Sequence, residues 1–198
     1  ALFIQNFFPK TNLTLIESDK IGILGAGEGT TPGFPYFLKV VGISEEDFIK
    51  ETCATIKCVV DFINCGGDNT SFKHDFWTGQ HAYHFNAKLV ASYFKKIAIE
   101  RGLNHITGDI VEVILDENND VSKLILDNKQ EHNVEFVFDC SGFKKLILGN
   151  VYKPKWKSYQ DFLKVNTAIP FFLPRTDTNL NTRTEAITLK YGWMWKAP

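Results

Sequence analysis

The stretch LTLIE, residues 13–17, decides the fold class, because an apolar run typical of a short buried strand ends there on an acid, Glu17. An α/β nucleotide-binding sheet places such an acid against a ribose hydroxyl after its first βα unit. Upstream, residues 2–8 are typical of the end of a buried helix, which Pro9 and Asn12 break. The strand and Gly-rich loop that should come first are missing, so we expect the chain to have lost its beginning.

Downstream of that strand, helical and strand patterns follow one another. Ser44 with Asp47 indicates a helix N-cap, and Gly102 ends the most regular helical pattern. Residues 117–120 (ENND) predict a turn between two strands. The predicted elements are helices over 34–41, 44–52 and 86–101, a buried strand over 54–63, and strands over 110–115, 121–126 and 134–138. This order predicts an α/β fold with an antiparallel strand group over 110–138.

Charge and composition argue against several classes of partner. The formal net charge is −1, with acids and bases scattered along 198 residues, which gives no electrostatic case for nucleic acid or an anionic membrane surface. No apolar run is long enough to span a bilayer and the start lacks a signal-peptide pattern, which favours a cytoplasmic protein.

The cysteines and histidines give no case for a metal. The cysteines lack paired CxxC spacing, which favours reduced core thiols over a zinc site; they are Cys53, Cys58, Cys65 and Cys140. His81 and His84 have no cluster of further ligands beside them, so we expect no metal site.

Six segments resemble, in the same order, those of one enzyme family. LIESDK at 15–20 and GEGTTP at 27–32 resemble the flavin-contact segments of the flavin-dependent tryptophan halogenases, where GEATxP is usual and Gly29 takes the place of the alanine. The other segments are TIKC at 55–58, AYHFNA at 82–87, DCSGF at 139–143 and GWMWKAP at 192–198. The last resembles the WxWxIP signature that separates these halogenases from flavin monooxygenases of similar fold, with Ala197 in place of isoleucine.

The resemblance implies a FAD/NAD(P)-binding fold, with a parallel sheet flanked by helices plus the antiparallel strand group, truncated at both ends. Residues 1–151 would form the FAD-binding domain, lacking its first strand and Gly-rich loop, and residues 152–198 would start a substrate-side region. Family members are longer at both ends. The spacing is also compressed between Trp77 and His81, where relatives often carry a longer stretch near the substrate.

The activity that the resemblance implies is that of an FADH2-dependent halogenase, an oxidoreductase. Such an enzyme forms hypohalous acid from reduced FAD, dioxygen and chloride or bromide, and then halogenates an electron-rich aromatic substrate. The implied partners are a small aromatic substrate and a separate flavin reductase, with a homo-oligomer left open. Two rival functions remain: a flavin-dependent aromatic monooxygenase and a catalytically silent flavin-binding domain.

Lys57 is the candidate catalytic residue. An ammonium beside Ile56, Cys58 and Val59 is costly to bury unless another group uses or compensates it. The resemblance assigns it the role of the catalytic lysine, which either polarises hypohalous acid by a hydrogen bond or reacts as the neutral amine to form a haloamine. The ordinary alternative is a strand lysine whose head reaches solvent.

The resemblance also implies flavin contacts and a wall between flavin and substrate. Glycine-rich backbone lets a loop approach a flavin closely. The predicted cofactor-binding residues are Glu17, Ala26, Gly27, Glu28, Gly29, Thr30, Ile110, Asp139 and Gly142. Trp193 and Trp195 would wall the flavin from the substrate chamber. A surface turn for the glycine loop, an isolated acid at Glu17 and core packing for Ile110 and the tryptophans are the alternatives.

Overall fold

The structure is a computed structural model that describes residues 1–23, 25, 28–174 and 180–198. Contacts divide the chain into two compact units: unit 1 comprises residues 1–13, 23–104 and 167–198, and unit 2 comprises residues 14–22 and 105–166. The predicted domain boundary between residues 151 and 152 falls inside unit 2, so the compact units divide the chain elsewhere. The assignment of residues 1–151 to flavin binding stays a prediction.

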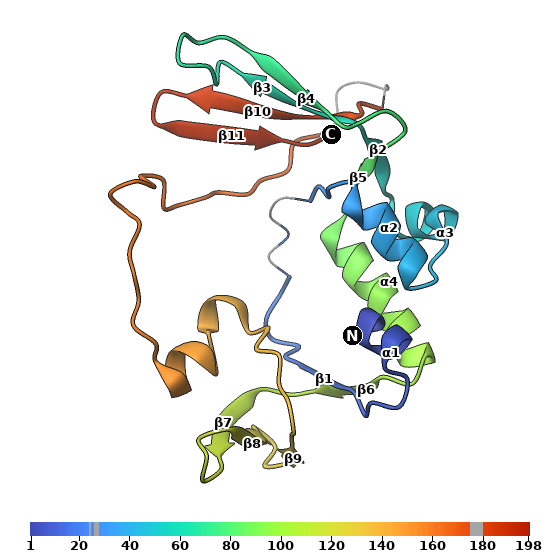
Figure 1. Ribbon diagram of the computed structural model, residues 1–198, viewed down its shortest axis with the longest axis vertical. Coiled ribbons are helices and arrows are strands. Elements are labelled where there is room, and N and C mark those ends of the chain that lie inside the picture. Colours follow the sequence, from blue (N-terminus) through green and yellow to red (C-terminus); the bar gives the residue numbers. More distant parts are fainter. Residues whose placement is uncertain (24, 26–27, 175–179) are drawn as a thin grey trace. The chain divides into compact units, whose positions relative to one another are not determined.

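The α-helices described belong to unit 1 and follow the predicted pattern (Figure 1). In α3 the Ser44 hydroxyl accepts a hydrogen bond from the Asp47 amide at 3.3 Å, which confirms the predicted N-cap. Asn86 caps α4 in the same way, and Gly102, at φ +87°, follows its end. The helices are α1 (Leu2–Phe7), α2 (Gly33–Val40), α3 (Glu45–Thr52) and α4 (Ala87–Glu100).

An aromatic core joins α2, α3 and α4 of unit 1 to a strand. Phe48 and Tyr83 are fully buried, with ring centroids 5.1 Å apart. Phe34 and Phe94 stack with centroids 6.2 Å apart, and Phe34 also contacts Phe48. Edge-on and offset ring contacts of this kind stabilise a core beyond the area that they bury. The first helix, by contrast, buries only Leu2 among its residues, so the predicted buried helix over 2–8 is largely exposed.

Unit 1 also holds two sheets. The four-stranded sheet has the order β11-β10-β3-β4, in which β3 and β10 are parallel and the other neighbours antiparallel. A separate antiparallel pair, β2 with β5, sets Lys57 opposite Ala82. The strands are β2 (Thr55–Lys57), β3 (Val59–Ile63), β4 (Phe72–Asp75), β5 (Ala82–His84), β10 (Arg183–Leu189) and β11 (Gly192–Lys196).

The single strand predicted over 54–63 is wrong, because the chain changes sheet at Cys58. The Cys58 amide donates to the Thr182 carbonyl at 2.7 Å, and its carbonyl accepts from the Phe76 amide at 3.0 Å. These bonds belong to the four-stranded sheet, whereas the residues before them pair with β5. The split leaves Lys57 at the end of a short strand.

Unit 2 contains β1 (Thr14–Glu17) and a three-stranded antiparallel sheet; β1 pairs with β6 (Asn104–Thr107), of which all but the first residue belongs to unit 2. The Gly108 amide donates to the Glu17 carbonyl and the Asn104 amide to the Leu13 carbonyl, an ascending register that makes β1 and β6 parallel. In the three-stranded sheet, β7 (Ile110–Leu115) and β8 (Val121–Leu126) confirm two predicted strands. Asp116 closes the turn between them by accepting from two backbone amides.

The third strand of that sheet is β9 (Glu131–Asn133), so the strand predicted over 134–138 is wrong. Val134 still donates to the Ser122 carbonyl, but Phe136 and Phe138 beyond it are 76% and 64% exposed and pack edge-on against each other. The alternation of apolar residues that predicted a strand comes here from two exposed rings, which no other part of unit 2 covers. A short 3-10 helix (Gly142–Lys144) and a π-helix (Leu148–Tyr152) follow, and residues 153–174 are exposed.

The architecture is therefore mixed α/β, with parallel and antiparallel sheets. The described strands pair in parallel only at β3 with β10 and at β1 with β6, so the single helix-flanked parallel sheet that was predicted is not observed in this form. The four cysteines are free but exposed, which makes the prediction of core thiols wrong; Cys53, for instance, sits at the left-handed end of α3. Within the described ranges, no helix has the length and apolarity that a membrane crossing requires.

Candidate active site

Lys57 projects from the end of β2 into the interior of unit 1. Its exposed fraction is 4%, and Nζ donates a hydrogen bond to the Thr30 carbonyl at 3.2 Å. None of the described carboxylates forms an ion pair with this amine. Burial without a counter-ion lowers the pKa of Lys57 from its ordinary value. The neutral amine is therefore more accessible than in a solvated lysine.

Aromatic rings flank the amine in a cavity of about 440 Å³, which we call the lysine cavity. Nζ lies 5.5 Å from the ring centroid of Trp195 and 5.8 Å from that of Phe76, within cation–π range. The cavity is lined by Thr30, Thr31, Pro32, Lys57, Val60, His74, Asp75, Phe76, Trp77, Gln80 and Trp195. A largely apolar chamber with one buried amine suits a small aromatic molecule and an electrophile that the amine can hold.

His84 is a second buried ionisable group close to this amine. Its exposed fraction is 4%, and Nε2 lies 2.7 Å from the hydroxyl oxygen of fully buried Thr184. Burial and, secondarily, the positive charge of Lys57 lower the pKa of His84 to about 4. The ring is therefore neutral at pH 7. Its Nδ1 is buried and has no hydrogen-bond partner among the described residues, which is an uncommon and costly state for a native side chain.

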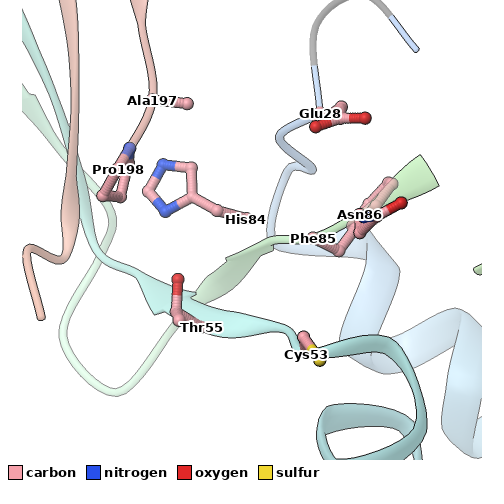
Figure 2. Close-up of a pocket in the computed structure, with 8 residues that line it drawn as sticks. All are labelled: Glu28, Cys53, Thr55, His84, Phe85, Asn86, Ala197 and Pro198. Carbon is pink, nitrogen blue, oxygen red and sulfur yellow. The ribbon is translucent and has the colours of Figure 1, made fainter. Parts of the chain in front are cut away.

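His84 lines a second cavity of about 200 Å³, the histidine cavity (Figure 2). Figure 2 shows its ring directed toward Ala197 and Pro198, with Glu28 on the side of Asn86. Glu28 accepts a hydrogen bond from the Ala87 amide at the start of α4, 3.2 Å away. The full lining is Glu28, Cys53, Thr55, His84, Phe85, Asn86, Ala197 and Pro198.

Gly29 lies between the residues that line the two cavities. It forms an isolated bridge with His84, while Glu28 before it lines the histidine cavity and Thr30 after it lines the lysine cavity. A Cβ on Gly29 would lie 3.3 Å from Lys57 Nζ and 3.7 Å from His84 Cδ2. The lack of a side chain here keeps the space beside the amine open.

The predicted flavin contacts are divided between the units. Glu28, Gly29 and Thr30 lie beside Lys57 in unit 1, whereas Ala26 and Gly27 lie outside the described residues. For Thr30 the structure adds a contact that the sequence did not suggest, because its carbonyl holds the lysine amine.

The other predicted contacts belong to unit 2. Glu17 lies at the end of β1, and its carboxylate oxygen Oε1 is 2.8 Å from His105 Nε2. The contact is a hydrogen bond, and it is also an ion pair when the imidazole is protonated. Ile110 begins β7, and Gly142 has φ +61° at the start of the 3-10 helix. Asp139 binds its own loop, accepting from the Ser141 amide and hydroxyl and from two further backbone amides. Burial opposes ionisation, but these bonds outweigh it and lower the pKa of Asp139 to about 2.

The two predicted wall tryptophans differ in position. Trp195 lines the lysine cavity, whereas Trp193 packs edge-on against Trp195, with centroids 6.0 Å apart, and is 58% exposed. Sequence reasoning missed Phe76, Thr184 and the buried state of His84. The only sign of Phe76 in the sequence was its place as an aromatic residue just before the compressed spacing between Trp77 and His81. No group of three His, Cys, Asp or Glu side chains in the described part of the chain could hold a metal ion.

Comparison with solved structures identifies the class of protein that has this fold. The tryptophan 6-halogenase SttH of Streptomyces toxytricini superposes with a TM-score of 0.89 at 22% identity, covering 100% of this chain and 52% of that one. A flavin-dependent halogenase from Xanthomonas campestris superposes with a TM-score of 0.87 at 22% identity over 100% of this chain and 50% of that one. The fold is that of the flavin-dependent halogenases.

The sequence places the chain in a family within that class. The family model described as "Tryptophan halogenase" matches residues 1–81 and 77–198, and the chain belongs to this family of oxidoreductase-type enzymes. The tryptophan 7-halogenase RebH of Lentzea aerocolonigenes is 24% identical over 94% of this chain and 48% of its own length. The 7-chloro-L-tryptophan 6-halogenase KtzR of Kutzneria is 22% identical over 100% of this chain and 53% of its own. The chain thus spans about half the length of these relatives.

Relatives carry residues inside the matched region that this chain lacks. The alignment with KtzR runs over 272 residues, although this chain has 198, and the two family matches meet at residues 77–81. This agrees with the compressed spacing predicted there. In the structure the segment is a closed turn, in which the Gln80 amide donates to the Trp77 carbonyl at 2.8 Å and Gly79 has φ +80°.

Proposed function

We propose that the protein is a flavin-dependent halogenase that uses reduced FAD, dioxygen and a halide to halogenate an electron-rich aromatic substrate, with Lys57 handling the electrophilic halogen. The observation that carries this proposal is the buried amine of Lys57, which has no counter-ion among the described residues and faces an aromatic cavity. Family membership supplies the reaction class. The buried position of the amine indicates Lys57 as the residue that handles the halogen.

The neutral amine is the form that can react. Its lone pair attacks the halogen of hypohalous acid, the halogen–oxygen bond breaks, and the departing hydroxide takes one amine proton to leave as water. The N–H bond is replaced by an N–halogen bond, and the aromatic substrate then takes the halogen and returns a proton. The Thr30 carbonyl orients the amine throughout, because it accepts one of its hydrogens. The rings of Trp195 and Phe76 flank the nitrogen, with centroids 5.5 and 5.8 Å from Nζ.

One observation in particular supports a flavin site near Lys57: Nδ1 of buried His84 has no hydrogen-bond partner among the described residues. A nitrogen of this kind calls for a polar partner, and a flavin ring edge has hydrogen-bond donors and acceptors along it. Glu28, Gly29 and Thr30 would approach the flavin ring. Glu17 would accept a hydrogen bond from the adenosine ribose, and the backbone of Ile110 would pass the adenine. Asp139 and Gly142 would lie near the ribityl and pyrophosphate portion. When bound, reduced FAD would supply two of the four electrons that reduce dioxygen, and chloride or bromide would supply the other two as it is oxidised to hypohalous acid.

The substrate and the other partners follow from the same site. The lysine cavity supports a small aromatic substrate, such as the tryptophan that relatives' names specify. A separate flavin reductase would supply the reduced cofactor. We also propose that residues 152–198 begin the substrate side, because Trp195 of β11 lines the cavity beside Lys57.

A bromination assay tests the proposal. The protein receives FAD, a flavin reductase, NADH, bromide and an aromatic substrate panel, and brominated products are measured by mass spectrometry. Wild type and Lys73→Met, a control lysine exposed on β4, should form product, whereas Lys57→Met should form none. Equal product from Lys57→Met would remove Lys57 from the mechanism. A hydroxylated product that forms without bromide would replace halogenation by monooxygenation.

A further inference from the structure

The contact between His84 and Thr184 bears on which ring nitrogen of the imidazole carries the proton. His84 comes from β5 and Thr184 from β10, and His84 Nε2 lies 2.7 Å from Thr184 Oγ1. Thr184 is fully buried, and among the described residues this nitrogen is the only hydrogen-bond partner of its hydroxyl. A buried hydroxyl that does not donate leaves its proton unsatisfied, which costs free energy. The arrangement of lower energy therefore has the Thr184 hydroxyl donating and His84 Nε2 accepting.

This arrangement determines the state of the other ring nitrogen. A neutral imidazole carries a single proton, and His84 is neutral at pH 7. When Nε2 accepts a hydrogen bond, that proton is on Nδ1. His84 is 4% exposed, and Nδ1 has no partner among the described residues. The unpartnered group is thus an N–H donor, and the partner that it needs is an acceptor.

The lining of the histidine cavity favours an acceptor without charge. Figure 2 shows the His84 ring directed toward Ala197 and Pro198, which line this cavity with it. The described lining residues include the carboxyl group of Glu28 and no lysine or arginine. A halide ion would therefore lose its hydration there without a cation to compensate it. A carbonyl oxygen accepts from an N–H without that cost.

We propose that His84 donates from Nδ1–H to a carbonyl oxygen of the flavin ring, and that Thr184 is the positioning residue that holds the imidazole in this tautomer. This inference rests on the proposed function and deepens it, because it adds a flavin contact to the predicted set and names the kind of ligand atom. A flavin ring carries two carbonyl oxygens on its pyrimidine part. Thr184 does not touch the flavin and acts only through His84.

The tautomer can be measured without flavin or turnover. In protein labelled with nitrogen-15 histidine, two-bond nitrogen–proton correlation spectra at pH 7 show which ring nitrogen is protonated, and the signals lost in His84→Gln are those of His84. Wild type should carry the proton on Nδ1. Thr184→Ser, the matched control, keeps the hydroxyl and should keep this tautomer, whereas Thr184→Val should show both tautomers. A wild type with the proton on Nε2 would overturn the proposal, and an unchanged tautomer in Thr184→Val would remove Thr184 from it.

Titration with FAD tests the acceptor. Quenching of FAD fluorescence measures binding independently, and bound FAD should shift the Nδ1 signal of His84, whereas bromide alone should not. The dissociation constant for FAD should rise roughly tenfold in Thr184→Val, about the value of one net hydrogen bond, and stay as in wild type in Thr184→Ser. FAD that binds without moving the His84 signal would refute this inference alone, and a shift on bromide would replace the carbonyl by a halide. If wild type binds no FAD, the proposed function fails, while the tautomer result still stands.

Discussion

The amine of Lys57 lies 3.2 Å from the carbonyl oxygen of Thr30, and this neutral acceptor is the hydrogen-bond partner that the structure records for it. A carboxylate in that place would stabilise the ammonium and raise its pKa. A carbonyl also fixes the direction of the nitrogen, but it stabilises the ammonium much less than a carboxylate would. The pair therefore combines a defined position with an amine that loses its proton readily.

Trp195 should matter for turnover and Trp193 should not. Trp195 lies 5.5 Å from Nζ and lines the lysine cavity, so Trp195→Leu removes the ring that helps to position the reactants beside the neutral amine, and halogenation should fall roughly tenfold. Trp193→Leu is the matched control, because this ring is 58% exposed and does not line the cavity. Product formation under identical flavin supply measures both. Equal losses would show that the pair acts only through packing.

The hydrogen bond between Thr184 and His84 should contribute measurably to folding. Thr184 is fully buried, and Thr184→Val would leave His84 Nε2 without a partner. The free energy of unfolding should drop by about 1–3 kcal/mol, which urea denaturation can measure. Thr182→Val, at an exposed residue just before β10, is the control and should cost about 0.5 kcal/mol or less. If both variants lose the same free energy of unfolding, His84 Nε2 has another hydrogen-bond partner in place of Thr184.

Stability should fall on acidification because of His84. Its folded pKa of about 4 lies below the ordinary 6.5, so the unfolded chain binds this proton first. The contribution of neutral His84 to the free energy of unfolding is complete above pH 6.5 and is lost as the pH falls toward 4. At 1.36 kcal/mol per pH unit, the loss reaches about 3 kcal/mol.

Urea titrations between those pH values measure this dependence. His84→Gln should flatten it, whereas His74→Gln, at an exposed residue, should leave it as in wild type. An unchanged slope in His84→Gln would assign the acid sensitivity to other groups.

The elements that local patterns specify were predictable. The Ser44 cap and the helix that ends before Gly102 depend on neighbours within one or two turns, and the structure confirms both. The break at Cys58 was not predictable in this way, because it is set by pairing with Thr182, more than a hundred residues along the chain. A run of apolar residues looks the same whether it joins one sheet or two.

The candidate site shows the same division. Burial of Lys57 could be inferred from its apolar neighbours, and the resemblance pointed to Trp195. The Thr30 carbonyl and the Gly29 space depend on how the loop folds back over β5, which the sequence does not reveal. Phe136 and Phe138 misled the strand prediction, because exposed rings give the same alternation as buried ones.

Transfer of halogen from the protein itself tests the central claim most directly. The protein is turned over with reduced FAD, dioxygen and bromide without an aromatic substrate, desalted rapidly, and then mixed with tryptophan in bromide-free buffer. Wild type should deliver up to one equivalent of brominated product, because the halogen stays on the Lys57 amine, and Lys57→Met should deliver none. Equal delivery by Lys57→Met, or none by a wild type that brominates in the continuous assay, would contradict the account.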